Sequence, residues 1–314
     1  MTDRFPNLYL VGAAKAGTTA LYATMARHPD IYAPHTLKEP NFMAMEGKPL
    51  TFRGPGDMVK GGQFRSLTTR EEYLDLYRPG IRLRWMLDAS PLYLRDQYAP
   101  ERILQYAPDA RIMMVIRNPI EAAFSFYVMF RRDGREPFRD FLKAFEDSSR
   151  RLAAGWEEGW DIKGFFRYPA QIRRYLDLFE KNRLLILHYD ELRADYAGVL
   201  NRIAGFLRID PLLFPTSSGR ENSSPTLRNM IHRSAPARFI RPGFGILRKA
   251  IPSPLMRFVR KRYLDAPAFR MKKEEFDYLL RYYGAEIDEL ESLLKWDLSS
   301  WKRFRGDQAE KSRA

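Results

Sequence analysis

The sequence of 314 residues contains no cysteine, which excludes a disulfide framework, a thiolate nucleophile and a cysteine metal site. No stretch approaches the roughly 18 consecutive apolar residues of a membrane-spanning helix. No charged segment followed by an apolar one precedes the first apolar run, so we expect no signal peptide. The few histidines show no spacing typical of metal ligands; they are His28, His35, His188 and His232. These absences favour a soluble, cytoplasmic protein that carries no metal.

Hydrophobic residues make up 45% of the chain and aromatic residues 14%, which is enough to bury a sizeable core. We therefore expect one large domain over residues 1–314. The formal net charge is +14, and the excess lies in one segment: residues 228–273 hold thirteen Lys and Arg residues against one acid, Asp265. Such an excess indicates an anionic ligand or acceptor, or a charged surface such as lipid or nucleic acid.

Short apolar runs alternate with helical patterns along most of the chain. The runs of strand length cover residues 5–11, 84–89, 111–116 and 183–189. The helical patterns cover residues 19–28, 168–180, 190–207 and 272–295, and another helix is expected to begin at Pro119. This alternation predicts an α/β fold, in which a P-loop-like central parallel sheet is flanked by helices on both faces.

The first predicted strand ends in a loop of small residues, Gly12-Ala13-Ala14-Lys15-Ala16-Gly17-Thr18-Thr19. Its glycine spacing nearly matches a Walker A loop, but Thr18 stands where the Walker lysine is required, and Lys15 lies earlier. Backbone N–H groups and threonine hydroxyls at the start of a helix can hold a phosphate. The loop therefore predicts an anion site, with an ordinary strand-to-helix turn as the alternative.

Two segments resemble the donor-binding motifs of sulfotransferases. FPNLYLVGAAKAGTTAL is similar to the family's 5′-phosphosulfate loop, P-K-[ST]-G-[TS]-[TS], with Ala14 in place of proline and Ala16 in place of Ser or Thr. RIMMVIRNPIEAAFSFYVMF is similar to the 3′-phosphate motif, with Arg117 ending a strand and Ser125 on the next helix. The resemblance implies that Arg117 and Ser125 bind the 3′-phosphate of 3′-phosphoadenylyl sulfate. It also implies that the 5′-phosphate is bound by Lys15, Ala16, Gly17, Thr18 and Thr19.

Further segments resemble the heparan sulfate and bacterial branches of this family. HPDIYAPHTLKEPNFMA is similar to the region after the loop, and LDASPLYL to a Glu-Lys-(Ser/Thr)-Pro-x-Tyr-Phe segment, with Ala89 in place of the lysine. The C-terminal KWDLSSW also looks like the family. Residues 225–270 match no part of the pattern, and we expect them to form a basic amphipathic insertion or lid that borders the acceptor site.

The resemblance implies in-line transfer of a sulfuryl group to an acceptor hydroxyl or amine, with adenosine 3′,5′-bisphosphate as product and no metal. Lys15 is expected to stabilise the charge that develops on the leaving 5′-phosphate. Glu39 matches the catalytic glutamate of the heparan branch and is expected to take the acceptor's proton. Asp88 and His35 are the alternatives for this base.

Several points stay open on the sequence. Adenine-stacking candidates include Tyr168 and Trp85, and Asn222 with Ser223 is a candidate for a late donor contact. The acceptor is a carbohydrate, a glycolipid or a small metabolite, and the basic segment favours an anionic or lipid-linked one with peripheral membrane contact. No nucleic-acid partner is expected.

Two rival functions remain. A P-loop nucleotide kinase would need a lysine in place of Thr18 and a carboxylate to hold Mg²⁺. A non-enzymatic basic protein that binds membranes or nucleic acid would explain the charge of residues 228–273, but it would leave the ordered phosphate motifs unexplained.

Overall fold

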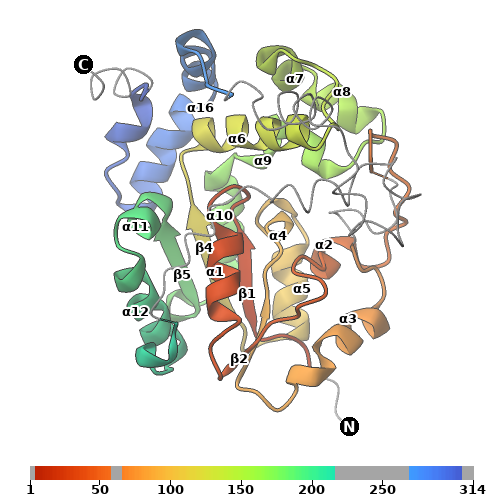
Figure 1. Cartoon of the computed structure of the whole chain (residues 1–314), viewed down its shortest axis with the longest axis vertical. Helices are drawn as coiled ribbons and strands as arrows, with labels where there is room; N and C mark the ends of the chain where they lie inside the picture. The colour runs from red at the N-terminus through yellow and green to blue at the C-terminus, as the bar shows by residue number, and fades with distance from the viewer. Residues whose placement is uncertain (1–3, 58–65, 216–268, 306–314) are drawn as a thin grey trace, which may run out of the picture. The chain divides into compact units, whose positions relative to one another are not determined.

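The computed structural model describes residues 4–57, 66–215 and 269–305. At its centre lies a five-stranded sheet with the order β2-β3-β1-β4-β5, in which every neighbouring pair is parallel (Figure 1). The strands are β1 (Leu8–Gly12), β2 (Ile31–Tyr32), β3 (Trp85–Asp88), β4 (Arg111–Ile116) and β5 (Leu184–His188). The predicted parallel α/β fold is confirmed, and four of these strands coincide with the predicted apolar runs.

The fifth strand, β2, was not predicted from the sequence. It is two residues long, too short to carry a periodic pattern. It follows the buried His28, whose Nδ1 accepts the Asp30 N–H at 3.2 Å and whose Nε2 lies 3.0 Å from the Asp210 carbonyl oxygen. The contact of His28 with the distant turn at Asp210 fixes the chain just before β2, and pairing with β3 then makes it a strand.

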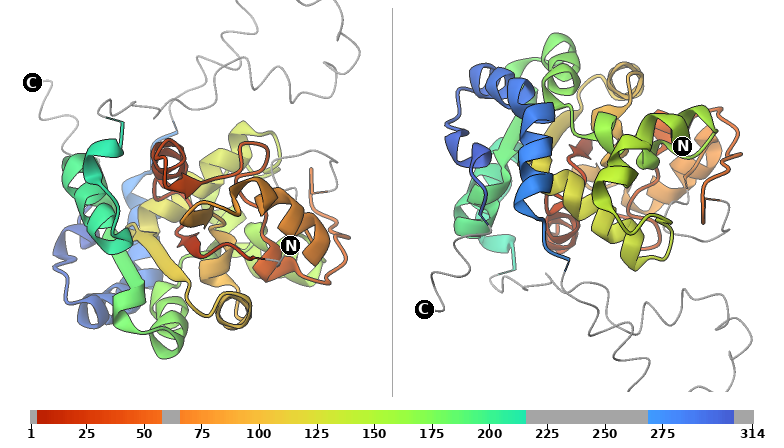
Figure 2. Two further views of the ribbon diagram at one scale, coloured as in Figure 1. Left: turned by 90° about the horizontal axis from the view of Figure 1, so that it is seen from below. Right: turned by 90° about the horizontal axis from the view of Figure 1, so that it is seen from above.

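Helices lie on both faces of the sheet. Figures 1 and 2 show α1 on one face, and α5 and α10 on the opposite face. The helices next to the sheet are α1 (Thr18–Met25), α4 (Leu92–Arg95), α5 (Ala99–Tyr106), α10 (Tyr168–Leu178), α11 (Tyr189–Ala194) and α12 (Tyr196–Leu207). In α1 the residues Leu21, Tyr22 and Met25 are buried. Strands covered on both faces are continuous apolar runs, as β1 and β4 are.

One predicted helix is wrong in its extent. The pattern over residues 190–207 is divided between α11 and α12, which meet at Asp195. The Asp195 side chain accepts the Gly198 N–H at 2.8 Å and so caps α12. An aspartate cap begins a new helix because it satisfies a backbone donor that has no helical partner.

The long C-terminal helix α16 (Lys273–Leu294) packs against α6 (Pro119–Arg132) and α10. Its buried residues recur every three or four positions, as the sequence predicted for residues 272–295; they are Phe276, Leu279, Tyr283, Ile287 and Leu290. The remaining elements are short. They are α2 (Phe42–Met45), α3 (Arg70–Tyr77), η1 (Arg78–Gly80), η3 (Lys181–Arg183), η4 (Pro211–Leu213) and η6 (Ser299–Lys302).

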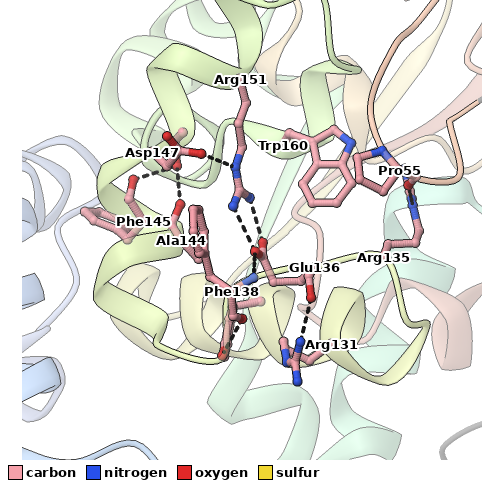
Figure 3. Close-up of polar contacts among 12 residues, drawn as sticks. Pro55, Arg131, Arg135, Glu136, Phe138, Ala144, Phe145, Asp147, Arg151 and Trp160 are labelled. Carbon is pink, nitrogen blue, oxygen red and sulfur yellow. Dashed lines mark hydrogen bonds and ion pairs between the residues drawn. The ribbon is translucent and has the colours of Figure 1, made fainter.

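A group of short helices follows α6: α7 (Phe141–Glu146), α8 (Ser148–Ala153), η2 (Glu158–Trp160) and α9 (Ile162–Phe165). A fully buried ion pair holds it together, as Figure 3 shows. Arg151 donates to both carboxylate oxygens of Glu136, at 2.6 and 2.8 Å, and its Nε donates to Asp147 at 3.0 Å. The pairing is complete, so the buried charge of Arg151 is compensated within this group.

The basic segment 228–273 lies almost entirely outside the described residues, as do Asn222, Ser223 and His232. The expectation of a lid or insertion around residues 225–270 therefore stays a prediction. Within the part of the chain that the structure describes, no helix is long and apolar enough to cross a membrane.

Candidate active site

The predicted anion-binding loop, residues 12–19, is called the anion loop below. It connects the end of β1 to the start of α1, at the carboxyl edge of the sheet. The strand order changes direction between β1 and β4, and in open parallel sheets ligands bind outside the carboxyl ends of the strands at such a point. The loop is fixed to β4 by the Ala13 N–H, which donates to the Val115 carbonyl at 2.7 Å. The sequence motif and the sheet topology therefore indicate the same site.

Two residues of the loop have left-handed backbone conformations, Lys15 with φ 62° and Gly17 with φ 81°. At Gly17 a Cβ atom would also lie 3.1 Å from Leu192 Cδ2, so both conformation and space require glycine there. Gly17 is the N-cap of α1, and no side chain caps this helix. The N–H groups of its first turn therefore have no side-chain acceptor, which suits a bound anion.

Lys15 is the cation of this loop. Burial, and after it the neighbouring Arg117 guanidinium, lower the pKa of Lys15 below its ordinary value, while the more weakly acting carboxylates of Asp133 and Glu39 raise it. The lowered pKa means that the charged form of Lys15 is poorly compensated in the ligand-free protein. An anion bound in the loop would supply the missing compensation.

Arg117 lies at the end of β4 and reaches the same loop. Its Nη1 donates to the Lys15 carbonyl oxygen at 2.9 Å, and its Nη2 donates to Glu121 at 3.1 Å. The guanidinium lies 4.7 Å from the centre of the Tyr189 ring. Its Nε is buried and has no acceptor among the described residues. Arg117 is thus held in place on three sides while part of its hydrogen-bonding capacity is unused.

Ser125 lies on α6 four residues after Glu121, so these two side chains share one face of the helix that begins beside Arg117. Asn118 caps this helix by accepting the Ile120 N–H at 3.0 Å, and its Nδ2 donates to the Trp301 carbonyl at 3.0 Å. The C-terminal KWDLSSW segment is therefore hydrogen-bonded to Asn118, the residue that follows Arg117.

Arg305 was not predicted as a site residue. Its Nη2 lies 3.1 Å from Asp190, and its Nε lies 3.8 Å from Glu121, the carboxylate that also pairs with Arg117. The helical spacing of Arg117 and Glu121 could have predicted their ion pair. No local pattern could have predicted Arg305, because its partners lie far away in the sequence.

Glu39 and the loop are joined by a lysine. Lys38 Nζ donates to Glu39 Oε1 at 2.7 Å and to Thr18 Oγ1 at 3.4 Å. Since Thr18 is the first residue of α1, the predicted base lies beside the predicted anion loop. Lys38 therefore bridges the predicted base and the loop.

Asp88, the alternative base, is fully buried at the end of β3. Its carboxylate accepts hydrogen bonds from three hydroxyls, those of Tyr73 at 2.7 Å, Ser90 at 2.7 Å and Tyr93 at 2.8 Å. Burial raises the pKa of Asp88 to about 6, although the three hydrogen bonds lower it. A carboxylate in this enclosed position is engaged with the protein, whereas Glu39 is partly exposed.

The remaining predicted residues divide by position. Tyr168 is buried near Arg117, and its hydroxyl has no partner among the described residues, so it stays a candidate for a donor contact. Trp85 begins β3 and lies beside Arg111 at the amino edge of the sheet, so it is not near the loop. His35 is exposed, and His188 packs on Trp296 and Trp301.

Comparisons with known proteins agree with this geometry. Residues 6–212 match the model of the sulfotransferase family. Over 221 residues the chain is 28% identical to bifunctional heparan sulfate N-deacetylase/N-sulfotransferase 1 of Mus musculus. This match covers 66% of this chain and 22% of that protein. Bifunctional heparan sulfate N-deacetylase/N-sulfotransferase 4 of Mus musculus is 27% identical over 222 residues, a match that covers 67% of this chain and 23% of that protein. The chain thus spans less than a quarter of the length of these relatives.

Among solved structures, a sulfotransferase from Alicyclobacillus acidocaldarius matches with a TM-score of 0.73 at 26% identity, over 95% of this chain and 99% of that one. The family match covers more than half of the chain, and the parallel sheet agrees with the predicted fold. The chain therefore belongs to the sulfotransferase family.

Proposed function

We propose that the chain transfers the sulfuryl group of 3′-phosphoadenylyl sulfate to an acceptor hydroxyl or amine, with Glu39 as the base and Lys15 at the leaving phosphate. The observation that carries the proposal is the hydrogen bond of 2.9 Å from Arg117 Nη1 to the Lys15 carbonyl oxygen. This contact joins the end of β4 to the anion loop, so a single ligand with two separate phosphate groups can reach both cations. A nucleoside diphosphate lacks the second group.

The unused polar groups of the site fit such a donor. Arg117 Nε has no acceptor among the described residues, and the first turn of α1 has no side-chain cap. In the proposal the 3′-phosphate takes Arg117 and Ser125, and the 5′-phosphate takes the loop. The loop contributes Lys15 together with Ala16, Gly17, Thr18 and Thr19. Phosphate oxygens are the acceptors that such N–H groups and guanidinium nitrogens bind most strongly.

In the reaction the bond between sulfur and the bridging oxygen of the 5′-phosphate breaks, while a bond from the acceptor oxygen or nitrogen to sulfur forms. The electron pair of the broken bond stays on the phosphate, beside the Lys15 ammonium. The proton of the acceptor passes to Glu39. Lys38 contacts Oε1 of Glu39, and Oε2 has no partner among the described residues, so Oε2 is the oxygen that receives the proton. The product is adenosine 3′,5′-bisphosphate.

The acceptor is proposed only as a class: a hydroxyl or amine on a carbohydrate, a glycolipid or a small metabolite. The relatives named for heparan sulfate N-sulfotransfer support a carbohydrate amine, but Ala89 replaces the lysine of their resembling segment. The basic composition of residues 228–273 supports an anionic or lipid-linked acceptor and contact with an anionic membrane surface.

The test is the binding of adenosine 3′,5′-bisphosphate and of ADP, measured by calorimetry. The wild type is expected to prefer the bisphosphate at least about tenfold, because only that ligand carries a 3′-phosphate for Arg117. The Arg117→Ala variant is expected to lose this preference. The control is Arg173→Ala, which removes an exposed arginine that pairs with Glu289 on the surface and should bind like the wild type. Equal binding of both nucleotides, or full affinity in Arg117→Ala, would contradict the proposed donor.

A further inference from the structure

The three hydroxyls on Asp88 do not have equal surroundings. Ser90 Oγ also accepts the Asn41 N–H at 3.1 Å, and the Tyr93 hydroxyl accepts the Met43 N–H at 3.3 Å. The Tyr73 hydroxyl donates to Asp88 at 2.7 Å, but it accepts no backbone N–H among the described residues. Two of the three hydroxyls therefore connect the buried carboxylate to the backbone that follows Glu39, and the third does not.

The two amides belong to the start of α2, where a helix has no carbonyl of its own to accept them. Glu39 precedes them by only a few bonds. Pro40 restricts the backbone of Glu39 to extended conformations, and Asn41 is fixed in the left-handed region, with φ 54°. The backbone between Glu39 and α2 thus has little freedom, and a displacement of either amide would move Glu39.

The direction of each hydroxyl follows from the carboxylate. An ionised carboxylate accepts hydrogen bonds and donates none, so the Ser90 and Tyr93 protons point to Asp88. The lone pairs of both oxygens are then free for the amides of Asn41 and Met43. The side chains of Asp88, Ser90 and Tyr93 are all completely buried. A buried network that is fully satisfied has one arrangement, which makes it a rigid support.

We propose that Asp88 is a positioning residue for Glu39, acting through Ser90 and Tyr93 on the amides of Asn41 and Met43. The inference rests on the proposed function, in which Glu39 is the base. It gives Asp88 a role other than that of an alternative base: it holds the Lys38-Glu39 pair at the anion loop without touching the substrate.

The chain offers a matched pair of variants for the test. Tyr93→Phe and Tyr73→Phe each remove one buried hydroxyl donor from Asp88, but only Tyr93→Phe removes an acceptor from the Glu39 loop. Ser90→Ala removes the other acceptor. We expect kcat to fall about tenfold to a hundredfold in Tyr93→Phe and Ser90→Ala, since small misplacements of catalytic groups cost this much. The donor KM should stay unchanged, and Tyr73→Phe should keep kcat within about twofold.

A second measurement does not depend on activity. Hydrogen exchange at the amides of Asn41 and Met43 should accelerate in Ser90→Ala and Tyr93→Phe, respectively, but not in Tyr73→Phe. Denaturation midpoints of the three variants show whether their folds are lowered in stability to a similar extent. Unchanged exchange, or an equal loss of kcat in Tyr73→Phe and Tyr93→Phe, would overturn the positioning role.

The variant Glu39→Gln distinguishes a failure of the positioning role from a failure of the proposed function. If Glu39→Gln keeps near-normal turnover, Glu39 is not the base and the proposed mechanism fails, and the role of Asp88 in positioning a base fails with it. If Glu39→Gln loses activity while Tyr93→Phe and Ser90→Ala behave like Tyr73→Phe, only the positioning role fails.

Discussion

Arg151 and Arg117 are two arginines of the same chain that stand in opposite electrostatic situations. Arg151 is completely buried. Each of its three guanidinium nitrogens donates a hydrogen bond to a carboxylate, either that of Glu136 or that of Asp147 (Figure 3). Arg117 retains 18% of its side-chain exposure, shares one carboxylate, and leaves Nε without an acceptor among the described residues. One arginine is fully compensated inside the protein, and the other is compensated only in part.

The difference teaches how the same residue type serves stability or binding. A fully paired guanidinium fixes the local fold and has nothing left for a ligand. The partly paired guanidinium of Arg117 lies beside Lys15, whose pKa is lowered. In the proposed donor site, both groups would gain their missing partners from an anion. The following predictions test this contrast, beginning with the largest expected effect.

Breaking the compensated site should destabilise the fold. Arg151→Met leaves the Glu136 carboxylate buried without its partner, and the free energy of unfolding is expected to fall by about 3–5 kcal/mol. The double variant Glu136→Leu with Arg151→Met should recover most of that loss, because no unpaired charge is left. Denaturant titration measures both.

The neighbouring Arg150 provides the control, since it pairs with Asp147 at the surface. Arg150→Met should leave the free energy of unfolding almost unchanged, because ion pairs of exposed side chains contribute little. If Arg150→Met and Arg151→Met lose equal stability, the buried pair has no special role.

Breaking the partly compensated site should instead affect turnover. Lys15→Ala is expected to lower kcat about a hundredfold to a thousandfold, because the charge on the leaving phosphate loses its cation. The folded state should keep its stability, since Lys15 is poorly compensated without a ligand. Steady-state kinetics with labelled donor, compared with Lys273→Ala at an exposed ion pair, measures the effect. A Lys15→Ala turnover within about tenfold of the wild type would assign the leaving-group role elsewhere.

The smallest effect is a proton taken up on binding. The pKa of Lys15 in the free protein is lowered by burial and by Arg117, and a bound phosphate raises it again by its negative charge. Between these two pKa values, binding must therefore take up a fraction of a proton. At about pH 9 the ligand's own phosphates are already ionised, so they contribute nothing.

Calorimetry of adenosine 3′,5′-bisphosphate binding in two buffers with different ionisation enthalpies measures this uptake. Lys15→Ala should bind without uptake. A release of protons by the wild type would show that the lysine is not compensated by the ligand.

The local structure around the proposed donor site could be predicted from the sequence. The loop from Gly12 to Thr19 and the arginine that follows β4 each belong to a strand, a turn and a helix that are consecutive in the chain. Local patterns describe such units well, because the contacts that form them connect residues close in sequence. The C-terminal helix followed from the same periodicity.

The acceptor side could be predicted only in part. Glu39 was named from its resemblance, yet its bridge to Thr18 through Lys38 is a tertiary contact. Trp85 and Asp88 both lie in one predicted strand. In the structure they are the first and last residues of β3, so they lie at opposite edges of the parallel sheet. A strand's direction relative to the site cannot be read from its own residues.

The sequence by itself determined the fold class and the family, and it named the candidate residues for two phosphate groups, because those features lie in contiguous segments with fixed spacing. Only the tertiary structure decided which charges are compensated. It brought Arg305 to the carboxylate that also holds Arg117, and it enclosed Asp88 among three hydroxyls. The physical reason is that burial and long-range pairing set the state of a charged group, and both depend on residues that are distant in the chain.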